Sequence, residues 1–380
     1  MKLLFIQDSG LSESIGLMNI SAILKANGHD CNLFIVSEEK NLFKKIYAYN
    51  PDIIGFSCIT GMHKWVISLA KEIKKKFNVP IIVGGPHATY YPEIIEEKPI
   101  DIISRGESEY AILELLDKLG KKQDIIEIKN LWVKKDNKIF KNPVRPLIED
   151  LDSPPLPDRG LYYNRYKFIR NMTMKRFISG IGCPYNCTFC HNPLMRELYK
   201  DKGKYVRKKS VERTIQEIEE VKKKYPLKTV HFSDDTFTID RKWLIKFLDE
   251  YKKRINLPFT CNVRIDLIDE ELAKKMKKAN CHAITYGLES GNEKMRNLII
   301  KKELSDTIII KNSRILKKAG IKILTTSIVG LPGETLENAL ETIKLNRKAG
   351  VDFTRINVLE PYPKLEIVSY SKAHGYLDKD

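Results

Sequence analysis

Three cysteines stand in one short segment, and their spacing suits a metal centre. Cys183, Cys187 and Cys190 follow the spacing C-x3-C-x2-C within residues 180–193, a segment rich in glycine, proline and asparagine. Such residues form turns, so the three thiols can face one point in space. A structural zinc site closes with four ligands, usually as two spaced pairs, and no partner pair follows within the next few dozen residues. A [4Fe–4S] cluster can accept three cysteines and leave its fourth iron open for a small molecule. The alternative is three buried thiols, or zinc with a distant fourth ligand.

The cysteine loop resembles the cluster loop of the radical S-adenosylmethionine (SAM) superfamily. In that family an aromatic residue typically precedes the last cysteine, and here it is Phe189. The resemblance implies a [4Fe–4S] cluster whose open iron is chelated by the amino and carboxylate groups of SAM. It also implies that an electron from an external donor of the flavodoxin or ferredoxin type splits SAM into methionine and a 5′-deoxyadenosyl radical. Such an enzyme is expected to work anaerobically.

Downstream of the cysteines, apolar segments of strand length alternate with amphipathic helical segments. Strands are predicted at 229–232, 259–262, 282–287, 322–329 and 355–359. Helices are predicted at 210–224, 241–254, 269–279, 305–319 and 334–349, with Asp240, Asp269 and Ser305 as N-caps. Together with the strand before the cysteine loop, the pattern gives six β/α units, too few for a closed eightfold barrel. This count suits the partial (β/α)6 barrel of the radical SAM fold.

Four polar segments at the ends of these strands resemble the SAM-contacting segments of the family, in the same order. A carboxylate and hydroxyls in residues 233–236 are placed to hold the amino group of SAM. Glu289 and Arg264 resemble positions that contact its ribose and carboxylate. Residues 330–335 resemble the adenine-side loop, where glycine lets the backbone approach the ring. Each segment alone also fits a turn or a helix cap. The resemblance implies the SAM-binding residues Phe189, Ser233, Asp234, Asp235, Arg264, Glu289, Gly330 and Pro332.

The first 125 residues repeat the alternation in a Rossmann-like pattern. Near-continuous apolar strands are predicted at 2–6, 31–36, 53–58, 80–83 and 100–103. Such strands, separated by helices, require a parallel sheet covered on both faces. We therefore expect an α/β protein in which a doubly wound sheet precedes the partial barrel. Ligands of such sheets bind beyond the carboxyl ends of the strands. The G-x-G-x-x-G pattern is absent, which argues against NAD or FAD.

The landmarks of this first domain resemble the cobalamin-binding domain that precedes the radical SAM domain in one large subclass. They cover about the first 120 residues, at positions 15–17, 28–29, 51–57, 84–89 and 105–109. Cobalamin is therefore expected as a third cofactor. The resemblance implies the cobalamin-binding residues Gly16, Ser57, Thr60, Gly84, Gly85, His87, Gly106 and Glu107.

One departure concerns the cobalt ion. The Asp-x-His-x-x-Gly motif, through which many cobalamin proteins supply an axial histidine, is absent, as it often is in this subclass. We therefore expect His87 and His29 to serve as loop and cap residues rather than as cobalt ligands. The alternative for the whole domain is a Rossmann-like fold that has lost its ligand or binds a different one.

The predicted domains are a cobalamin-binding-like domain at 1–125, a linker at 126–170 and the radical SAM barrel at 171–380. The linker is stiffened by prolines and contains one possible hairpin at 131–140. Past the sixth strand, relatives usually have glycine and threonine where Lys364 and Leu365 stand. Many relatives also continue with a substrate-covering region, so an ending at residue 380 suggests a more open site, a covering partner or a sequence shorter than the gene.

Composition favours a cytoplasmic globular protein. Hydrophobic residues make up 42% and charged residues 30% of the chain. No apolar run reaches the roughly 18 residues of a membrane span, and the N-terminus turns polar too soon for a signal peptide. Four further cysteines are scattered singly in apolar surroundings, as is typical of buried reduced thiols. These are Cys31, Cys58, Cys261 and Cys281.

The net charge of +17 invites a nucleic-acid partner. Many of the lysines, however, fall in runs such as 74–76, 222–224 and 274–275, inside amphipathic helical patterns. Such runs usually form a solvated helix face. No basic segment interleaved with aromatic residues accompanies the charge, so a small-molecule or peptide substrate is expected instead.

These resemblances imply a cobalamin-dependent radical SAM enzyme, most simply a methyltransferase that acts on an unactivated carbon. The 5′-deoxyadenosyl radical abstracts hydrogen from the substrate, which then takes a methyl group from methylcobalamin. Alternatives are a cobalamin-dependent cyclase or rearrangement enzyme without methyl transfer, a corrinoid-binding protein with a regulatory cluster, and an RNA-modifying enzyme. Against the RNA-modifying enzyme, this sequence shows neither the extra clustered cysteines nor the RNA-binding module of methylthiotransferases. No catalytic side chain is assigned, and the substrate is not predicted.

Overall fold

The computed structural model describes residues 1–10 and 13–378, which form two compact units. The first unit comprises residues 1–171 together with the short segment 198–203. The second comprises residues 172–197 and the chain from 204 onward. In the described residues, no helix is long and apolar enough to cross a membrane.

The first unit contains a seven-stranded sheet in the order β2-β1-β3-β4-β5-β6-β7. The first five strands are parallel, as predicted, and β6 and β7 continue the sheet in the antiparallel sense. The hairpin expected within the linker is thus the edge of the first sheet. The strands are β1 Lys2–Gln7, β2 Asp30–Ile35, β3 Ile53–Ser57, β4 Ile81–Gly84, β5 Ile102–Ser104, β6 Leu131–Lys135 and β7 Lys138–Lys141.

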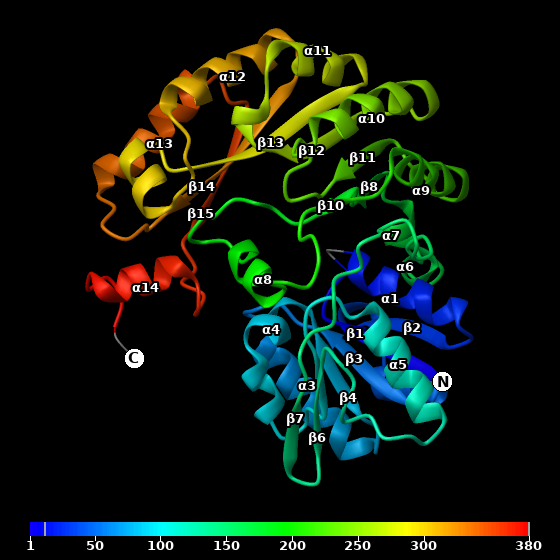
Figure 1. Ribbon diagram of the computed structural model, residues 1–380. Helices are drawn as coiled ribbons and strands as arrows, with labels where there is room; N and C mark the ends of the chain where they lie inside the picture. The colour runs from blue at the N-terminus through cyan, green and yellow to red at the C-terminus, as the bar shows by residue number, and fades with distance from the viewer. Residues whose placement is uncertain (11–12, 379–380) are drawn as a thin grey trace. The chain divides into compact units, whose positions relative to one another are not determined.

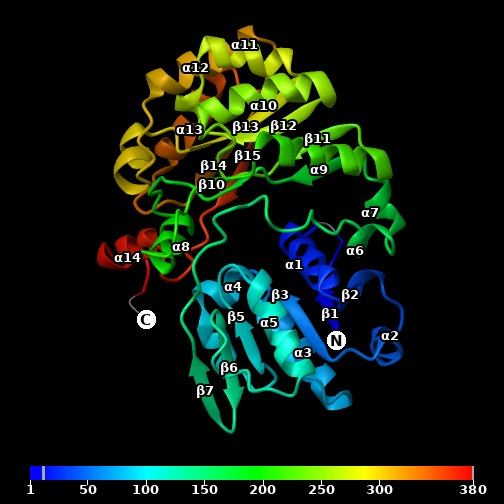
Figure 2. The same ribbon diagram turned by 45° about the vertical axis from the view of Figure 1, so that its right-hand side comes forward.

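Helices cover both faces of this sheet, as the continuous burial of its strands requires. Leu4 and Ile6 of β1 pack into one core with α3, while the alternate residues Leu3 and Phe5 are buried on the opposite face. Helices α1 and α5 lie together on one side of the strands (Figure 2). The helices are α1 Ile15–Ala26, α2 Leu42–Tyr49, α3 His63–Lys76, α4 Gly85–Tyr90, α5 Glu109–Gly120, α6 Gly160–Tyr163 and α7 Lys167–Asn171.

The second unit contains the expected partial barrel. Its six parallel strands follow the order β15-β14-β13-β12-β11-β8, and helices lie along the outer side (Figure 1). A two-stranded ribbon, β9 Gly180–Ile181 with β10 Arg207–Lys208, lies beside the cysteine loop. The six strands are β8 Met174–Phe177, β11 Thr229–Phe232, β12 Phe259–Val263, β13 Cys281–Glu289, β14 Lys322–Val329 and β15 Phe353–Val358.

The outer helices begin where their N-caps predict. Asp240, Asp269 and Ser305 accept hydrogen bonds from the backbone N–H groups three residues ahead, which satisfies donors that the helix itself leaves unpaired. The helices are α8 Asn192–Leu198, α9 Val211–Lys224, α10 Arg241–Arg254, α11 Glu270–Lys278, α12 Asp306–Lys318, α13 Leu336–Lys348 and α14 Glu366–Ala373.

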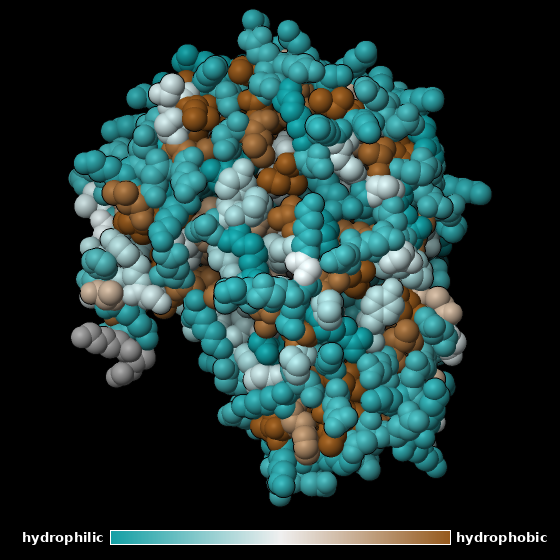
Figure 3. All heavy atoms as spheres, viewed as in Figure 1, coloured by the Kyte–Doolittle hydropathy of each residue, from teal (hydrophilic) through white to brown (hydrophobic). Residues whose placement is uncertain are grey.

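Lysine runs lie on the solvated side of these helices, as predicted. Residues 222–224 at the end of α9 are exposed, and so are Lys75 and Lys76 at the end of α3. Figure 3 shows hydrophilic side chains over most of the visible surface, with apolar ones scattered singly or in small groups. The four scattered cysteines are buried and free.

Candidate functional site

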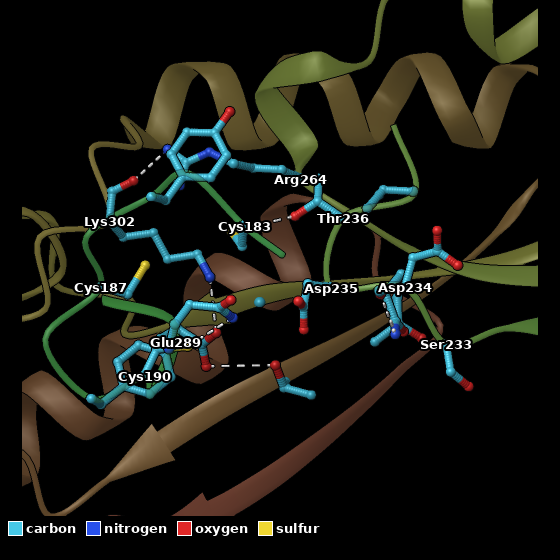
Figure 4. Close-up of a pocket in the computed structure, with 18 residues that line it drawn as sticks. Cys183, Cys187, Cys190, Ser233, Asp234, Asp235, Thr236, Arg264, Glu289 and Lys302 are labelled. Carbon is cyan, nitrogen blue, oxygen red and sulfur yellow. Dashed lines mark hydrogen bonds and ion pairs between the residues drawn. The ribbon is translucent and has the colours of Figure 1, made fainter. Parts of the chain in front are cut away.

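The carboxyl ends of the barrel strands surround a cavity of about 360 Å³ within the second unit. Figure 4 shows its lining side chains converging from the cysteine loop and from strands β11 to β14. The cavity brings together most of the residues predicted to bind the cluster and SAM. Those gathered are Cys183, Cys187, Phe189, Cys190, Ser233, Asp234, Asp235, Arg264 and Glu289. Gly330 and Pro332 are not among its lining residues.

The three cysteines present free, half-buried thiols to this cavity. Burial raises the pKa of the Cys187 and Cys190 thiols. Asn192 donates from its backbone N and its side-chain Nδ2 to Cys190 Sγ, both at 3.5 Å. Within residues 1–10 and 13–378, no three ligating side chains converge on one metal ion. A [4Fe–4S] cluster does not need that arrangement, because each thiolate binds a different iron. The donor set therefore fits the cluster.

The cysteine loop is held open by contacts to its backbone. Gly182 has φ +92°, and a side-chain Cβ there would lie 2.7 Å from the carbonyl oxygen of Tyr205, so only glycine fits. Arg196 of α8 donates to the carbonyl oxygens of Cys183 and Tyr185, each at 3.2 Å. These contacts fix the backbone of the loop, whose three cysteines line the cavity.

Arg264, directly after β12, also supports the cysteine loop, through the ring of Tyr185. Its guanidinium lies 3.7 Å from the centroid of the Tyr185 ring and pairs with Asp266 at 2.9 Å. It also donates to the backbone carbonyls of Lys302 and Glu303. The side chain is only 7% exposed, and its Nε and one terminal nitrogen already have protein acceptors. This environment favours a positioning role for Arg264 beside the predicted contact with SAM.

Glu289 forms a buried ion pair with Lys302, a residue that the sequence did not single out. Their Oε1 and Nζ atoms are 2.9 Å apart, and both side chains line the cavity (Figure 4). Thr326 Oγ1 donates to the other carboxylate oxygen at 3.5 Å. Glu289 has φ +64°, an unfavourable conformation for a residue with a side chain, and it turns the carboxylate into the site. A polar ligand thus meets a preset carboxylate and ammonium.

The adjacent aspartates have different environments. Asp234 is 2% exposed and accepts from Ser179 N at 3.0 Å, Ser179 Oγ at 2.6 Å and Lys208 Nζ at 3.3 Å. These bonds tie β11 to the start of the cysteine loop. Burial raises the pKa of Asp235, which accepts hydrogen bonds from Gly182 and Asn192. Asp235 is therefore the better placed of the two to meet a ligand at the cysteines.

The adenine-side loop is braced by Glu334. Its Oε2 accepts from the backbone N of Gly330 and, at 3.3 Å, from that of Leu331. Gly330 has φ +77°, so the turn requires a residue without a side chain. The contact of this loop with SAM stays a prediction.

In the first unit, the loops after β3 and β4 meet, and both contain residues predicted to bind cobalamin. Cys58 N donates to Gly84 O, and His87 N donates to Cys58 O, both at 2.9 Å. Gly85 has φ +88°, and a Cβ there would lie 2.9 Å from the Cys58 backbone. Thr60 Oγ1 lies 3.1 Å from His87 Nδ1. Small residues and hydroxyls thus form this edge of the sheet.

His63, which the sequence analysis overlooked, stacks on His87. The ring centroids are 4.5 Å apart and the rings nearly parallel. His63 Nδ1 is buried without a hydrogen-bond partner in the described residues. An unpartnered buried nitrogen beside hydroxyls and glycine backbone fits a ligand that brings its own polar groups, as a corrinoid does. The stacking of His87 on His63 supports the expectation that His87 is a loop residue rather than a cobalt ligand.

His87 also predicts a pH dependence. Burial, together with neighbouring His63, lowers its pKa from 6.5 to about 4, while Glu93 acts weakly in the opposite direction. A depressed pKa in the folded state means that folding favours the neutral ring. We expect the free energy of unfolding to fall as the pH drops from 6.5 towards 4, and His87→Gln to reduce this loss. Urea titrations at several pH values measure the free energy of unfolding. If this free energy changes equally with pH in the wild type and in His87→Gln, the assignment is contradicted.

Gly106 and Glu107 are occupied by contacts within the first unit. Tyr199, from the segment 198–203, receives a hydrogen bond on its hydroxyl from Glu107 N at 2.7 Å. The Glu107 carboxylate accepts from Ile148 N at 2.9 Å. Gly16 lies in the first turn of α1. Cobalamin contacts at these three positions stay predictions.

Gly106 allows a direct test of this packing. It has φ +70°, and a Cβ there would lie 2.0 Å from Tyr199 Oη. Gly106→Ala is therefore expected to lower the free energy of unfolding by roughly 2–4 kcal/mol, through backbone strain and overpacking. Gly28 is the matched control, because it has φ +80° but nothing within 4 Å of a built Cβ. Gly28→Ala should cost about 1–2 kcal/mol. Equal losses in chemical denaturation would refute the steric contact.

Two family models match the two halves of the chain. The model of the Radical SAM superfamily matches residues 177–346, and that of the B12 binding domain matches residues 1–116. The first match contains the three cysteines and all of the cavity-lining residues. The second contains every residue predicted to bind cobalamin.

Two curated proteins illustrate the range of relatives. The chain is 32% identical over 372 residues to an uncharacterized methyltransferase of Pyrococcus horikoshii, covering 96% of this chain and 79% of that protein. It is 29% identical over 368 residues to the anaerobic magnesium-protoporphyrin IX monomethyl ester cyclase of Rubrivivax gelatinosus. This alignment covers 90% of the chain but only 63% of the cyclase.

Solved structures share the fold across nearly the whole chain. The radical SAM methyltransferase TsrM of Kitasatospora setae gives a TM-score of 0.82 at 15% identity, covering 98% of this chain and 76% of that one. The cobalamin-dependent radical SAM enzyme OxsB gives 0.76 at 18% identity, covering 99% and 55%. At these identities the likeness establishes the architecture and leaves the substrate open.

Proposed function

This chain belongs to the radical SAM superfamily as a cobalamin-dependent member, and from that premise we propose that it is a methyltransferase acting on an unactivated carbon. The observation that carries the proposal is the 32% identity to the Pyrococcus horikoshii methyltransferase, which extends over 96% of the chain and therefore through both units. The cofactors of the protein are a [4Fe–4S] cluster, SAM and cobalamin.

The chemistry comes from the cofactors: the cluster and SAM supply a hydrogen-abstracting radical, and cobalamin supplies the methyl group. The protein's own residues bind and position these groups. Cys183, Cys187 and Cys190 hold the cluster on the cavity wall. Glu289 and Lys302 present opposite charges to the polar groups of SAM, and Asp235 lies near the cysteines to receive an ammonium group.

Rigidity of the cavity serves the same reaction. Asp234 ties β11 to the cysteine loop, and Arg264 joins that loop to the backbone after β13. Reacting groups held at fixed separation lose less entropy on the way to the transition state. The buried ion pair and the hydrogen-bonded aspartates preset the polar groups before the ligand arrives, so binding need not reorganise them.

A cyclase is the second candidate, favoured by the similarity to the Rubrivivax gelatinosus enzyme over 90% of this chain. The two functions consume SAM differently. A methyltransferase of this kind forms 5′-deoxyadenosine from one SAM and S-adenosylhomocysteine from another for each product, whereas a cyclase needs no methyl donor.

The test is to quantify both SAM products by chromatography. The reconstituted protein is incubated anaerobically with SAM, cobalamin and a reductant. A small-molecule extract of cells that naturally produce this protein is then added. We expect S-adenosylhomocysteine and 5′-deoxyadenosine to rise together when the extract is added. A rise in 5′-deoxyadenosine alone would refute methyl transfer and favour the cyclase. Bound cobalamin with no SAM cleavage would leave a corrinoid-binding protein.

A further inference from the structure

The inner face of the barrel continues from the cavity to its last strand. Thr326 of β14 lines the cavity and is paired in register with Arg355 of β15. Residues in register on neighbouring strands point to the same face, and residues two apart on one strand do so as well. Arg355 and Asn357 therefore both lie on the inner face, next to the cavity and on an edge strand.

The other charged groups around this cavity already have partners. Lys302 is paired with Glu289, Arg264 with Asp266, and Lys208 with Asp234. These three pairs leave no net charge of their own. They also show that a cation of this site is normally held by a carboxylate or by backbone oxygens.

Arg355 and Asn357 are different. Both are exposed, and beyond the backbone pairing of β15 neither side chain makes a hydrogen bond or ion pair with any residue in the described ranges 1–10 and 13–378. A guanidinium and a carboxamide thus stand two residues apart on the same face. Together they offer a positive charge and several N–H donors, with no protein acceptor to satisfy them.

The opposite edge of the sheet adds positive charge to the same face. Arg176 of β8 is in register with His231, which shares its face with the cavity residue Ser233. Arg176 Nε donates to Ser233 Oγ at 3.1 Å, and the Arg176 charge, after burial, lowers the pKa of His231. Arginines therefore stand at both edges of the inner face, with three ion pairs and the Asp235 carboxylate between them.

A planar guanidinium binds carboxylate and phosphate groups through paired hydrogen bonds, and an amide N–H₂ can add a third. We propose that the substrate carries an oxyanion, a carboxylate, phosphate or phosphonate group, which Arg355 and Asn357 bind on the inner face of β15. The inference rests on the proposed function, because it takes this face as the substrate side of the cavity. It specifies the chemical class of the substrate.

The test measures binding rather than turnover. Phenylphosphonate and benzoate serve as oxyanion probes, and benzamide serves as their neutral counterpart. Their affinities for the reconstituted protein with SAM are measured by ligand-observed NMR under anaerobic conditions. We expect both oxyanions to bind more tightly than benzamide, and the tighter of the two identifies the class of oxyanion.

Variants assign the binding to β15. Arg355→Gln should weaken oxyanion binding about tenfold or more, because charge-assisted hydrogen bonds are lost. Arg355→Lys should have an intermediate effect, and Asn357→Leu a smaller one. Arg314, an exposed arginine of α12 on the helical side, is the matched control, and Arg314→Gln should leave the affinity unchanged.

Three results would overturn the proposal. The first is a wild-type protein that binds neither oxyanion better than benzamide, and the second is unchanged affinity in Arg355→Gln. The third is a parallel loss of SAM affinity in that variant, which would make the carboxylate of SAM the bound anion. The binding experiment needs no turnover. Its result is therefore independent of the earlier test, in which absence of S-adenosylhomocysteine would refute methyl transfer alone.

Discussion

Replacing Cys187 by alanine is expected to abolish both cluster assembly and SAM cleavage. Three thiolates bind three of the four irons and leave the fourth open for SAM. Losing one thiolate leaves a second iron without its protein ligand. Among the described residues, the other titratable side chains that line the cavity include no further thiol. Iron and sulfide content and the 5′-deoxyadenosine yield after anaerobic reconstitution measure the effect. Cys183→Ala and Cys190→Ala should behave alike.

A buried cysteine outside the loop provides the control. Cys58 is free and fully buried in the first unit, and burial raises its pKa to about 12, so it is inert as a ligand. Cys58→Ala should retain full iron content, even if the cavity it leaves costs some stability. Full iron content and turnover in Cys187→Ala would eliminate the cluster assignment. Loss of iron in both variants would indicate a general folding defect instead.

Replacing Glu289 by glutamine is expected to weaken SAM binding at least tenfold while leaving the absorbance of the cluster intact. The substitution keeps the shape of the side chain but leaves the Lys302 ammonium without its partner in a site where the two side chains are 7% and 11% exposed. Breaking a buried ion pair by removing one partner typically costs about 3–5 kcal/mol. We expect part of this cost to appear as reduced stability of the second unit.

A double-mutant cycle separates the pair from its surroundings. Lys302→Met alone should also weaken SAM binding, and the double variant should recover stability relative to Glu289→Gln, because it leaves no unpaired charge. Thr326→Val is a matched control for loss of the 3.5 Å contact to the same carboxylate. Unchanged SAM affinity in Glu289→Gln, measured by equilibrium binding, would contradict the role assigned to this carboxylate.

The arrangement of strands and helices could be predicted because it depends on local pattern. Buried strands of the first sheet read as continuous apolar runs, and the outer helices carry N-caps at the expected positions. The cysteine spacing likewise predicts that the three thiols share one site, and all three line the cavity. Three residues on one short loop need no long-range contact to be recognised. The hairpin β6–β7 could be predicted from the sequence, but its place at the edge of the first sheet could not, because strand pairing with β5 depends on tertiary contacts.

The residues that were missed act through long-range contacts. Lys302 lies 13 residues beyond Glu289, past the π-helix Met295–Ile299, and reaches back to the carboxylate. No spacing rule connects two such positions. His63 begins α3 and meets His87 only because the loops after β3 and β4 adjoin. Tyr199 follows the cysteine loop in the sequence and fills the space beside Gly106 only in the folded chain.

The predicted SAM-binding residues show the complementary difficulty. The resemblance implies SAM contacts for Asp234 and Arg264, which both line the cavity, but it could not show how far each is already bonded to protein. Asp234 is held by Ser179 and Lys208, and Arg264 by Asp266 and two backbone carbonyls. Burial and hydrogen bonding therefore distinguish positioning residues from ligand contacts where sequence order does not.

The most direct measurement of the central claim follows the methyl group itself. The reconstituted protein is given SAM with a carbon-13-labelled methyl group, cobalamin, a reductant and the cell extract, and the labelled product is examined by mass spectrometry and carbon NMR. The account predicts a labelled methyl group bonded to carbon in an anionic small molecule. Label on oxygen, nitrogen or sulfur, or 5′-deoxyadenosine with no labelled product, would contradict it.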